Sequence, residues 1–181
     1  ENVEAILKLL EKADVLIEGF RPGVMERLGL GPKECHKKNK SLIYGRITGW
    51  GQDGPYCQRA GHDINYLAVT GALHAIGKKN LPPIPPLNYL ADYAGGTMFL
   101  IFGILSALWE KNNSGKGQVV DAAMVEGVSA ISSLIYSFIG EKQWSNSRES
   151  NLLDGGCPFY KCYQTSDQKY VAVGALESKF F

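Results

Sequence analysis

Apolar residues change their spacing several times along the first third of the chain. Apolar side chains recur at helical spacing over residues 3–10, and the short apolar run DVLIE at 14–18 is typical of a buried strand. Two short helices are predicted at 24–28 and 32–38, and a second apolar strand, SLIYGRIT, at 41–48. The order of helix, strand, helix and strand predicts a parallel α/β fold.

Longer elements are predicted after residue 48. A glycine-rich loop covers 49–61 and a helix is expected over 62–73. Residues 81–87 (LPPIPPL) predict an extended linker, because each proline removes a backbone donor and disfavours a helical conformation before it. The remaining expected elements are a long helix from Asp92 to about Glu110, a short strand at 118–121, an apolar helix at 122–139, and a β-hairpin formed by 159–165 and 169–174.

The polar stretch 141–156 predicts a connection between domains. We expect a large α/β domain over 1–140 and the start of a smaller domain over 157–181. The first residue is not a methionine and the last residues read as the start of a helix, so a piece of a longer protein is expected. The most apolar run, MFLIFGILSALW at 98–109, has 12 residues against the roughly 18 that cross a bilayer, which favours a buried core helix and no membrane span.

Composition excludes several classes of protein. The chain has 45% hydrophobic and 20% charged residues, which is typical of a globular protein rather than a disordered tail or a coiled coil. Lys and Arg number 19 against 18 Asp and Glu, so the basic surplus of most nucleic-acid binders is missing. Four cysteines are too few for a disulfide scaffold, and their spacing does not form a zinc site. We therefore expect free thiols and no metal.

Two glycine motifs resemble nucleotide-binding loops without meeting their requirements. GWGQDG at 49–54 has the G-x-G-x-x-G pattern, but Pro55 follows it and the next helical period starts only near His62. The sequence therefore favours a loop near some other ligand over a nicotinamide site. GKG at 115–117 lacks the upstream glycine and the following Ser or Thr of a P-loop.

Three titratable residues stand at predicted helix starts. His62 lies between a glycine-rich loop and a helix, and Asp92 precedes the most apolar helix. Glu177 begins the last segment. Asp92 and Glu177 have a structural alternative, since Asp and Glu are common at helix N-termini and an N-terminal cap is worth about 1 kcal/mol. The residues alone leave both interpretations open.

Several segments, taken in order, resemble one family. GHDINY at 61–66, LADYAGG at 90–96 and GALESKF at 174–180 are the most specific. Over essentially its whole length the chain resembles the α-methylacyl-CoA racemases of the family III CoA-transferase superfamily. The resemblance implies a Rossmann-like large domain, the start of a smaller domain, and a longer protein that forms an interlocked homodimer.

The resemblance also implies roles for individual residues. His62 matches the base that removes the α-proton of the S epimer, Asp92 the acid/base on the other face, and Glu177 a carboxylate beside this pair. Arg46 matches an arginine near the CoA, and Arg21 has a weaker match of the same kind. The segment expected to contact the acyl-CoA consists of Gly61, His62, Asp63, Ile64, Asn65 and Tyr66.

The implied reaction is epimerisation of 2-methylacyl-CoA thioesters by transfer of one proton through an enolate-like intermediate. Backbone N–H groups near Gly61–Asp63 are the candidates to bind the enolate oxygen. No metal or redox cofactor is expected, because CoA is part of the substrate. The resemblance implies a peroxisomal or mitochondrial location. Two alternatives stay open: a family III CoA-transferase that uses Asp92 as its nucleophile, and a fragment that binds acyl-CoA without catalysis.

Overall fold

The computed structural model describes residues 2–180, which form two compact units. The first contains the residues up to Thr70 together with Leu87–Ile131, and the second contains Gly71–Pro86 and the residues from Ser132 onward. The expected boundary lay at 141–156, whereas the first unit ends at Ile131 and a segment of the middle of the chain joins the second.

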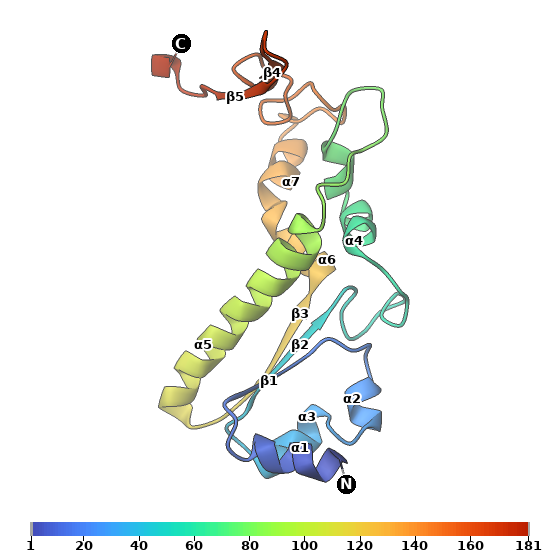
Figure 1. Ribbon diagram of the computed structural model, residues 1–181, viewed down its shortest axis with the longest axis vertical. Coiled ribbons are helices and arrows are strands. Elements are labelled where there is room, and N and C mark those ends of the chain that lie inside the picture. Colours follow the sequence, from blue (N-terminus) through green and yellow to red (C-terminus); the bar gives the residue numbers. More distant parts are fainter. Residues whose placement is uncertain (1, 181) are drawn as a thin grey trace. The chain divides into compact units, whose positions relative to one another are not determined.

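A three-stranded parallel sheet forms the centre of the first unit (Figure 1). Its strands are β1 (Val15–Glu18), β2 (Ile43–Thr48) and β3 (Val119–Ala123), in the order β1-β2-β3. The central strand places Arg46 opposite Glu18 of β1 and opposite Asp121 of β3. The parallel sheet confirms the predicted α/β class.

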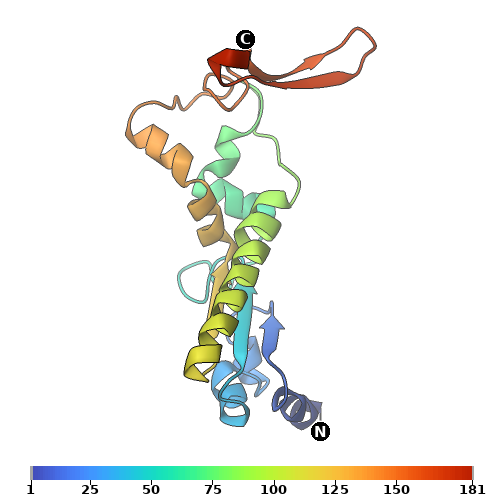
Figure 2. The same ribbon diagram turned by 90° about the vertical axis from the view of Figure 1, so that its left-hand side faces the viewer.

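Helices cover both faces of this sheet, and Figure 2 shows the long helix running along one of them. The helices on the other face are α1 (Asn2–Leu10), α2 (Val24–Arg27) and α3 (Pro32–Lys38). Successive side chains of a strand point to opposite faces. Tyr44 accordingly packs with Leu10 and Met25, and Ile43 with Leu100 and Ile104 of α5 (Met98–Ser114). Two hydrophobic clusters therefore hold the sheet in place.

Two helices of the first unit differ from their expected bounds. Helix α4 (Asp63–Thr70) was expected to reach residue 73, but it ends at Thr70, and the next residue, Gly71, has a left-handed φ of 81°. A short 3₁₀ helix, Ala72–Ala75, follows it. The helix expected from Asp92 begins earlier, as the π-helix η2 (Tyr89–Thr97), and continues into α5.

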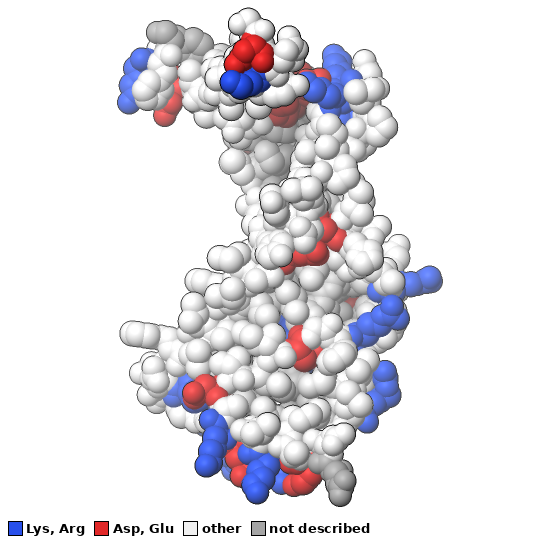
Figure 3. Space-filling view, in the orientation of Figure 1, with Lys and Arg blue, Asp and Glu red and all other residues white. Residues whose placement is uncertain are grey.

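The continuous helix Tyr89–Ser114 is long and apolar enough, by length and composition, to cross a membrane. The core helix of a globular domain has the same properties. Here Leu100, Ile104 and Ala107 pack against the sheet, whereas Phe102 and Trp109 on α5 are exposed, so the helix expected to be buried in the core is buried on one face only. Figure 3 shows few charged side chains on the surface over α5, whereas charges gather over α1 and α3.

The second unit contains α7 (Ser133–Gly140), the antiparallel hairpin of β4 (Tyr160–Gln164) and β5 (Tyr170–Gly174), and a final 3₁₀ turn, Ser178–Phe180. The hairpin confirms the prediction. The single helix expected over 122–139 is instead two helices, since α6 (Met124–Ile131) ends before Ser132.

Arg148 explains why Gly71–Pro86 belongs to the second unit. Its guanidinium donates to the carbonyls of His74 at 2.9 Å, Lys78 at 3.0 Å, and Leu81. The neighbouring Glu149 carboxylate accepts the N–H of Lys79 at 2.9 Å. These bonds join residues about 70 positions apart in the sequence, which the local pattern could not reveal.

Candidate active site

The candidate site lies at the carboxyl ends of β2 and β3, where ligands bind in open α/β sheets. From β2 the chain enters the glycine-rich loop and then α4, and from β3 it enters α6 directly. The π-helix η2 packs against both α4 and α6. A hydrogen bond of 3.1 Å from Val125 N–H to the Gly49 carbonyl joins the two strand ends.

His62 is the residue immediately before α4, and its backbone is held on both sides. Its N–H donates to Asn65 Oδ1 at 3.0 Å, and its carbonyl accepts the N–H of Asn65 at 2.8 Å. Such reciprocal bonds are the features of an N-terminal capping arrangement. The His62 side chain is exposed. The fold therefore presents an accessible imidazole on a fixed backbone.

Asp92 lies in the first turn of η2 and is half-buried. The residue at the cap position of this helix is Asn88, so the alternative in which Asp92 is the cap is wrong. The N–H of Asp92 donates to Asp63 Oδ2 at 2.9 Å, and the N–H of Ala91 donates to the same oxygen at 2.7 Å. Because Asp63 follows His62, this carboxylate brings the two predicted acid/base positions into one site.

Tyr66 was expected to contact the acyl-CoA, and that contact stays a prediction. Its side chain is buried, and its ring meets the ring of Trp50 edge-on at 4.7 Å between centroids. Burial raises the pKa of the Tyr66 phenol, and the negative charge of Asp92 raises this pKa further. The Tyr66 hydroxyl is therefore neutral at physiological pH and lies within the electrostatic reach of Asp92.

The start of α4 offers donors for a negatively charged oxygen. The N–H of His62 is taken by Asn65. Within residues 2–180, the N–H groups of Asp63 and Ile64 make no hydrogen bond to the protein. The first N–H groups of a helix lack intrahelical partners and favour an anion. These two amides fit the expected enolate-binding position near Gly61–Asp63.

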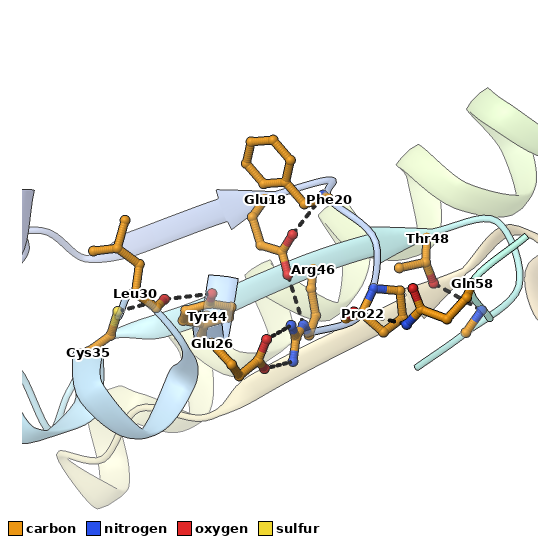
Figure 4. A network of polar contacts seen from close by, with 11 residues as sticks. Glu18, Phe20, Pro22, Glu26, Leu30, Cys35, Tyr44, Arg46, Thr48 and Gln58 are labelled. Carbon is orange, nitrogen blue, oxygen red and sulfur yellow. Dashed lines mark hydrogen bonds and ion pairs between the residues drawn. The ribbon is translucent and has the colours of Figure 1, made fainter. Parts of the chain in front are cut away.

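Arg46, expected near the CoA, is held in a buried ion-pair network (Figure 4). Its Nε donates to Glu18 Oε1 at 2.9 Å, and its Nη1 and Nη2 donate to the Glu26 carboxylate at 3.1 and 3.4 Å. The Arg46 side chain is 8% exposed. Freeing it for a phosphate would leave Glu18 buried without its partner, which costs several kcal/mol. The geometry favours a structural role, and contact with CoA stays a prediction.

Glu177 and Arg21 are not part of this cluster of contacts. Glu177 belongs to the second unit, is exposed, and precedes the 3₁₀ turn at Ser178–Phe180 rather than opening an α-helix. Its expected place beside His62 and Asp92 stays a prediction. Arg21 is exposed in the loop after β1.

In the described part of the chain, no group of three or more His, Cys, Asp or Glu side chains could hold a metal ion. Cys35, Cys57, Cys157 and Cys162 are free thiols. A cavity of about 660 Å³ lies within the second unit, lined by residues that include Lys78, Glu149 and Lys161, and it contains none of the predicted catalytic residues.

Known proteins resemble this chain over nearly all of its length. It is 48% identical to the human α-methylacyl-CoA racemase over 96% of the chain and 46% of that protein. It is 46% identical to the mouse protein of the same name over 100% of the chain and 48% of that protein. The chain therefore spans about half the length of the curated relatives that it matches.

A solved structure shares the fold. The crystal structure of a CAIB/BAIF family protein from Brucella suis superposes with a TM-score of 0.78 at 28% identity, covering 93% of this chain and 44% of that one. The sequence model of CoA-transferase family III matches residues 1–181 of the chain. The parallel sheet, the sequence identity and this match together show that the chain belongs to CoA-transferase family III.

Proposed function

We propose that the protein containing this chain epimerises 2-methylacyl-CoA thioesters. The observation that carries the proposal is the pair of hydrogen bonds from Ala91 and Asp92 to Asp63, which places Asp92 beside the helix start that bears His62. An imidazole and a carboxylate on adjoining elements suit a reaction that takes a proton from one face of a carbon and returns one to the other. The identity with two α-methylacyl-CoA racemases supports the same substrate class.

In this mechanism His62 removes the α-proton of the S epimer and the electron pair of the C–H bond moves to the thioester oxygen. The Asp63 and Ile64 N–H groups bind that oxygen. Asp92 then donates a proton to the opposite face, and the roles are reversed for the R epimer. General acid–base catalysis contributes roughly 10²–10⁴-fold per positioned group, and one oxyanion donor about 10²–10³-fold.

Tyr66 is a neutral aromatic neighbour of Asp92. Burial and the charge of Asp92 raise the pKa of the Tyr66 phenol, so the phenol keeps its proton at physiological pH. Glu177 from the small domain is the further carboxylate that the resemblance places at the site.

A CoA-transferase is the second candidate, and the match to CoA-transferase family III supports it. In that reaction the Asp92 carboxylate attacks the thioester and the CoA thiolate leaves. The thiolate then attacks the Asp92 carbonyl of the mixed anhydride, which releases the donor carboxylate and leaves CoA as a thioester on Asp92. An acceptor acid then takes the CoA. A third candidate is a chain that binds acyl-CoA without turnover. A homodimer and a peroxisomal or mitochondrial location are further proposals that rest on the resemblance alone.

The test uses the purified complete gene product and one epimer of a 2-methylacyl-CoA in deuterated water, with and without an acceptor acid. Exchange of the α-proton and inversion without an acceptor support the racemase. CoA transfer that needs an acceptor, with CoA trapped on Asp92 in the mass spectrum, supports the transferase. If both the gene product and residues 1–181 bind acyl-CoA and neither reaction occurs, the non-catalytic candidate is supported.

A further inference from the structure

The carboxylate of Asp63 is buried, and the residue is 4% exposed. Asp63 belongs to α4, but its carboxylate stabilises η2. It extends from the first residue of α4 to the first turn of η2, where Oδ2 accepts two backbone N–H groups. Its other oxygen, Oδ1, is buried and has no hydrogen-bond partner within residues 2–180. A buried carboxylate that is only partly satisfied costs free energy, so its retention calls for an explanation.

The π-helix gives a reason for this arrangement. The side chain of Asn88, at its cap position, caps no backbone N–H of the first turn; its Nδ2 donates instead to the Asp92 carboxylate at 3.4 Å. The N–H groups of Ala91 and Asp92 are therefore satisfied from outside the helix, by Asp63. In addition, the backbone of His62 is fixed by Asn65 of the same helix α4. One short element thus controls the backbone of both predicted acid/base residues.

We propose that Asp63 is a positioning residue, which sets Asp92 at the correct distance and on the correct side of the substrate carbon relative to His62. This inference rests on the proposed racemase function. Its carboxylate acts through Asp92 and does not itself transfer the proton. A displacement of about 1 Å in a catalytic group costs on the order of 100-fold in rate, so a lost anchor under Asp92 is large enough to measure.

Loss of this anchor has a signature that general destabilisation lacks. When Asp92 is displaced, His62 still removes the α-proton of the S epimer, exchanges it with solvent, and returns a deuteron to the same face. The S epimer then gains deuterium without inversion. A protein that is merely less stable loses exchange and inversion in the same proportion.

The experiment compares Asp63→Ala and Asp63→Asn with wild type, using the S epimer in deuterated water without an acceptor. Asp63→Ala is expected to lower inversion by about 100-fold and exchange by less than about 10-fold. Asp63→Asn keeps a carbonyl oxygen for both amides and is expected to recover part of the inversion. Asp92→Asn is the reference for complete loss of the second acid/base.

A matched control is Asn39→Ala. The Asn39 side chain also joins two segments through two backbone bonds, to the carbonyls of Leu10 and Ala13, both at 2.9 Å, but away from the site. This variant is expected to have a lower melting temperature and an unchanged ratio of exchange to inversion.

The inference is overturned if the Asp63 variants lower exchange and inversion equally, or lower neither. If Asp63→Ala does not fold, the ratio measured for Asp63→Asn decides in the same way. Failure of the proposed function gives a different result: wild type itself then shows no exchange without an acceptor, and the inference falls with it.

Discussion

At the level of single residues, the two predicted acid/base groups owe their positions to neighbours that transfer no proton. Asn65 holds the backbone of His62, and Asp63 holds that of Asp92. The sequence indicated His62 and Asp92 through the motifs around them. It named Asp63 and Asn65 as acyl-CoA contacts and did not indicate that they act as anchors, because an Asp or Asn in the first turn of a helix is common for local reasons alone.

Arg46 is a residue for which the sequence indicated a role but not its neighbours. The family motif suggested a ligand contact, whereas the structure surrounds the guanidinium with Glu18 and Glu26. The contact with Glu18 follows from the parallel register, which places these residues opposite each other on β1 and β2. Two strands had been predicted correctly, but their register depends on packing that the sequence pattern does not contain.

Glu26 makes this network sensitive to acid. Burial acts to raise the pKa of its carboxyl, but the hydrogen bonds from Arg46 and the backbone outweigh burial, so the pKa lies below its ordinary value of 4.5. A carboxyl with a lowered pKa in the folded state stabilises the protein above its unfolded pKa. That contribution is lost as the pH falls through the folded pKa.

We therefore expect Glu26→Gln to melt at a lower temperature than wild type above pH 4.5, with the difference closing as the pH falls through the lowered pKa of Glu26 in the folded protein. Thermal unfolding followed by circular dichroism between about pH 3 and 7 measures this difference. A difference that stays constant over the whole range would contradict the assigned role of Glu26.

At the level of elements, the placement of η2 depends on backbone contact with α6. A Cβ built on Gly127 would lie 1.7 Å from the Gly95 carbonyl oxygen, and one on Gly95 would lie 2.8 Å from the Val128 nitrogen. Only glycine permits two helix backbones to approach so closely. Since η2 carries Asp92, this contact also positions the site.

Gly127→Ala is accordingly expected to destabilise the protein by about 3 kcal/mol, because neither backbone can move aside without displacing a helix. Urea unfolding measures the change. The control is Gly140→Ala in α7, where an added Cβ meets nothing within 4 Å, so the protein should be as stable as wild type or up to about 1 kcal/mol more stable. Equal unfolding midpoints for Gly127→Ala and wild type would show that η2 and α6 can move apart at no cost in stability.

Element types were largely predictable from the sequence, and their ends less so. Pro32 and the lysines around residue 38 mark α3, and the alternation after Phe159 marks the hairpin; both were predicted correctly. The π-helix and the break at Ser132 were missed. For the π-helix, the contact of Gly95 with α6 involves residues distant in sequence, which the local pattern does not contain.

At the level of the whole molecule, the sequence predicted the parallel α/β class and the family, and both are confirmed. The division into domains, the role of Glu177 and a homodimer stay predictions. The first unit carries both predicted acid/base residues at the carboxyl end of its sheet. The central claim is therefore that His62 and Asp92 act on opposite faces of one carbon.

The most direct measurement follows deuterium exchange of each separate epimer by His62→Gln and by Asp92→Asn in the complete gene product. The account predicts opposite losses: His62→Gln loses exchange of the S epimer and keeps that of the R epimer, and Asp92→Asn does the reverse. Inversion is lost in both variants. If both variants lose exchange of the same epimer, or if Asp92→Asn still inverts at the wild-type rate, the two residues do not serve opposite faces.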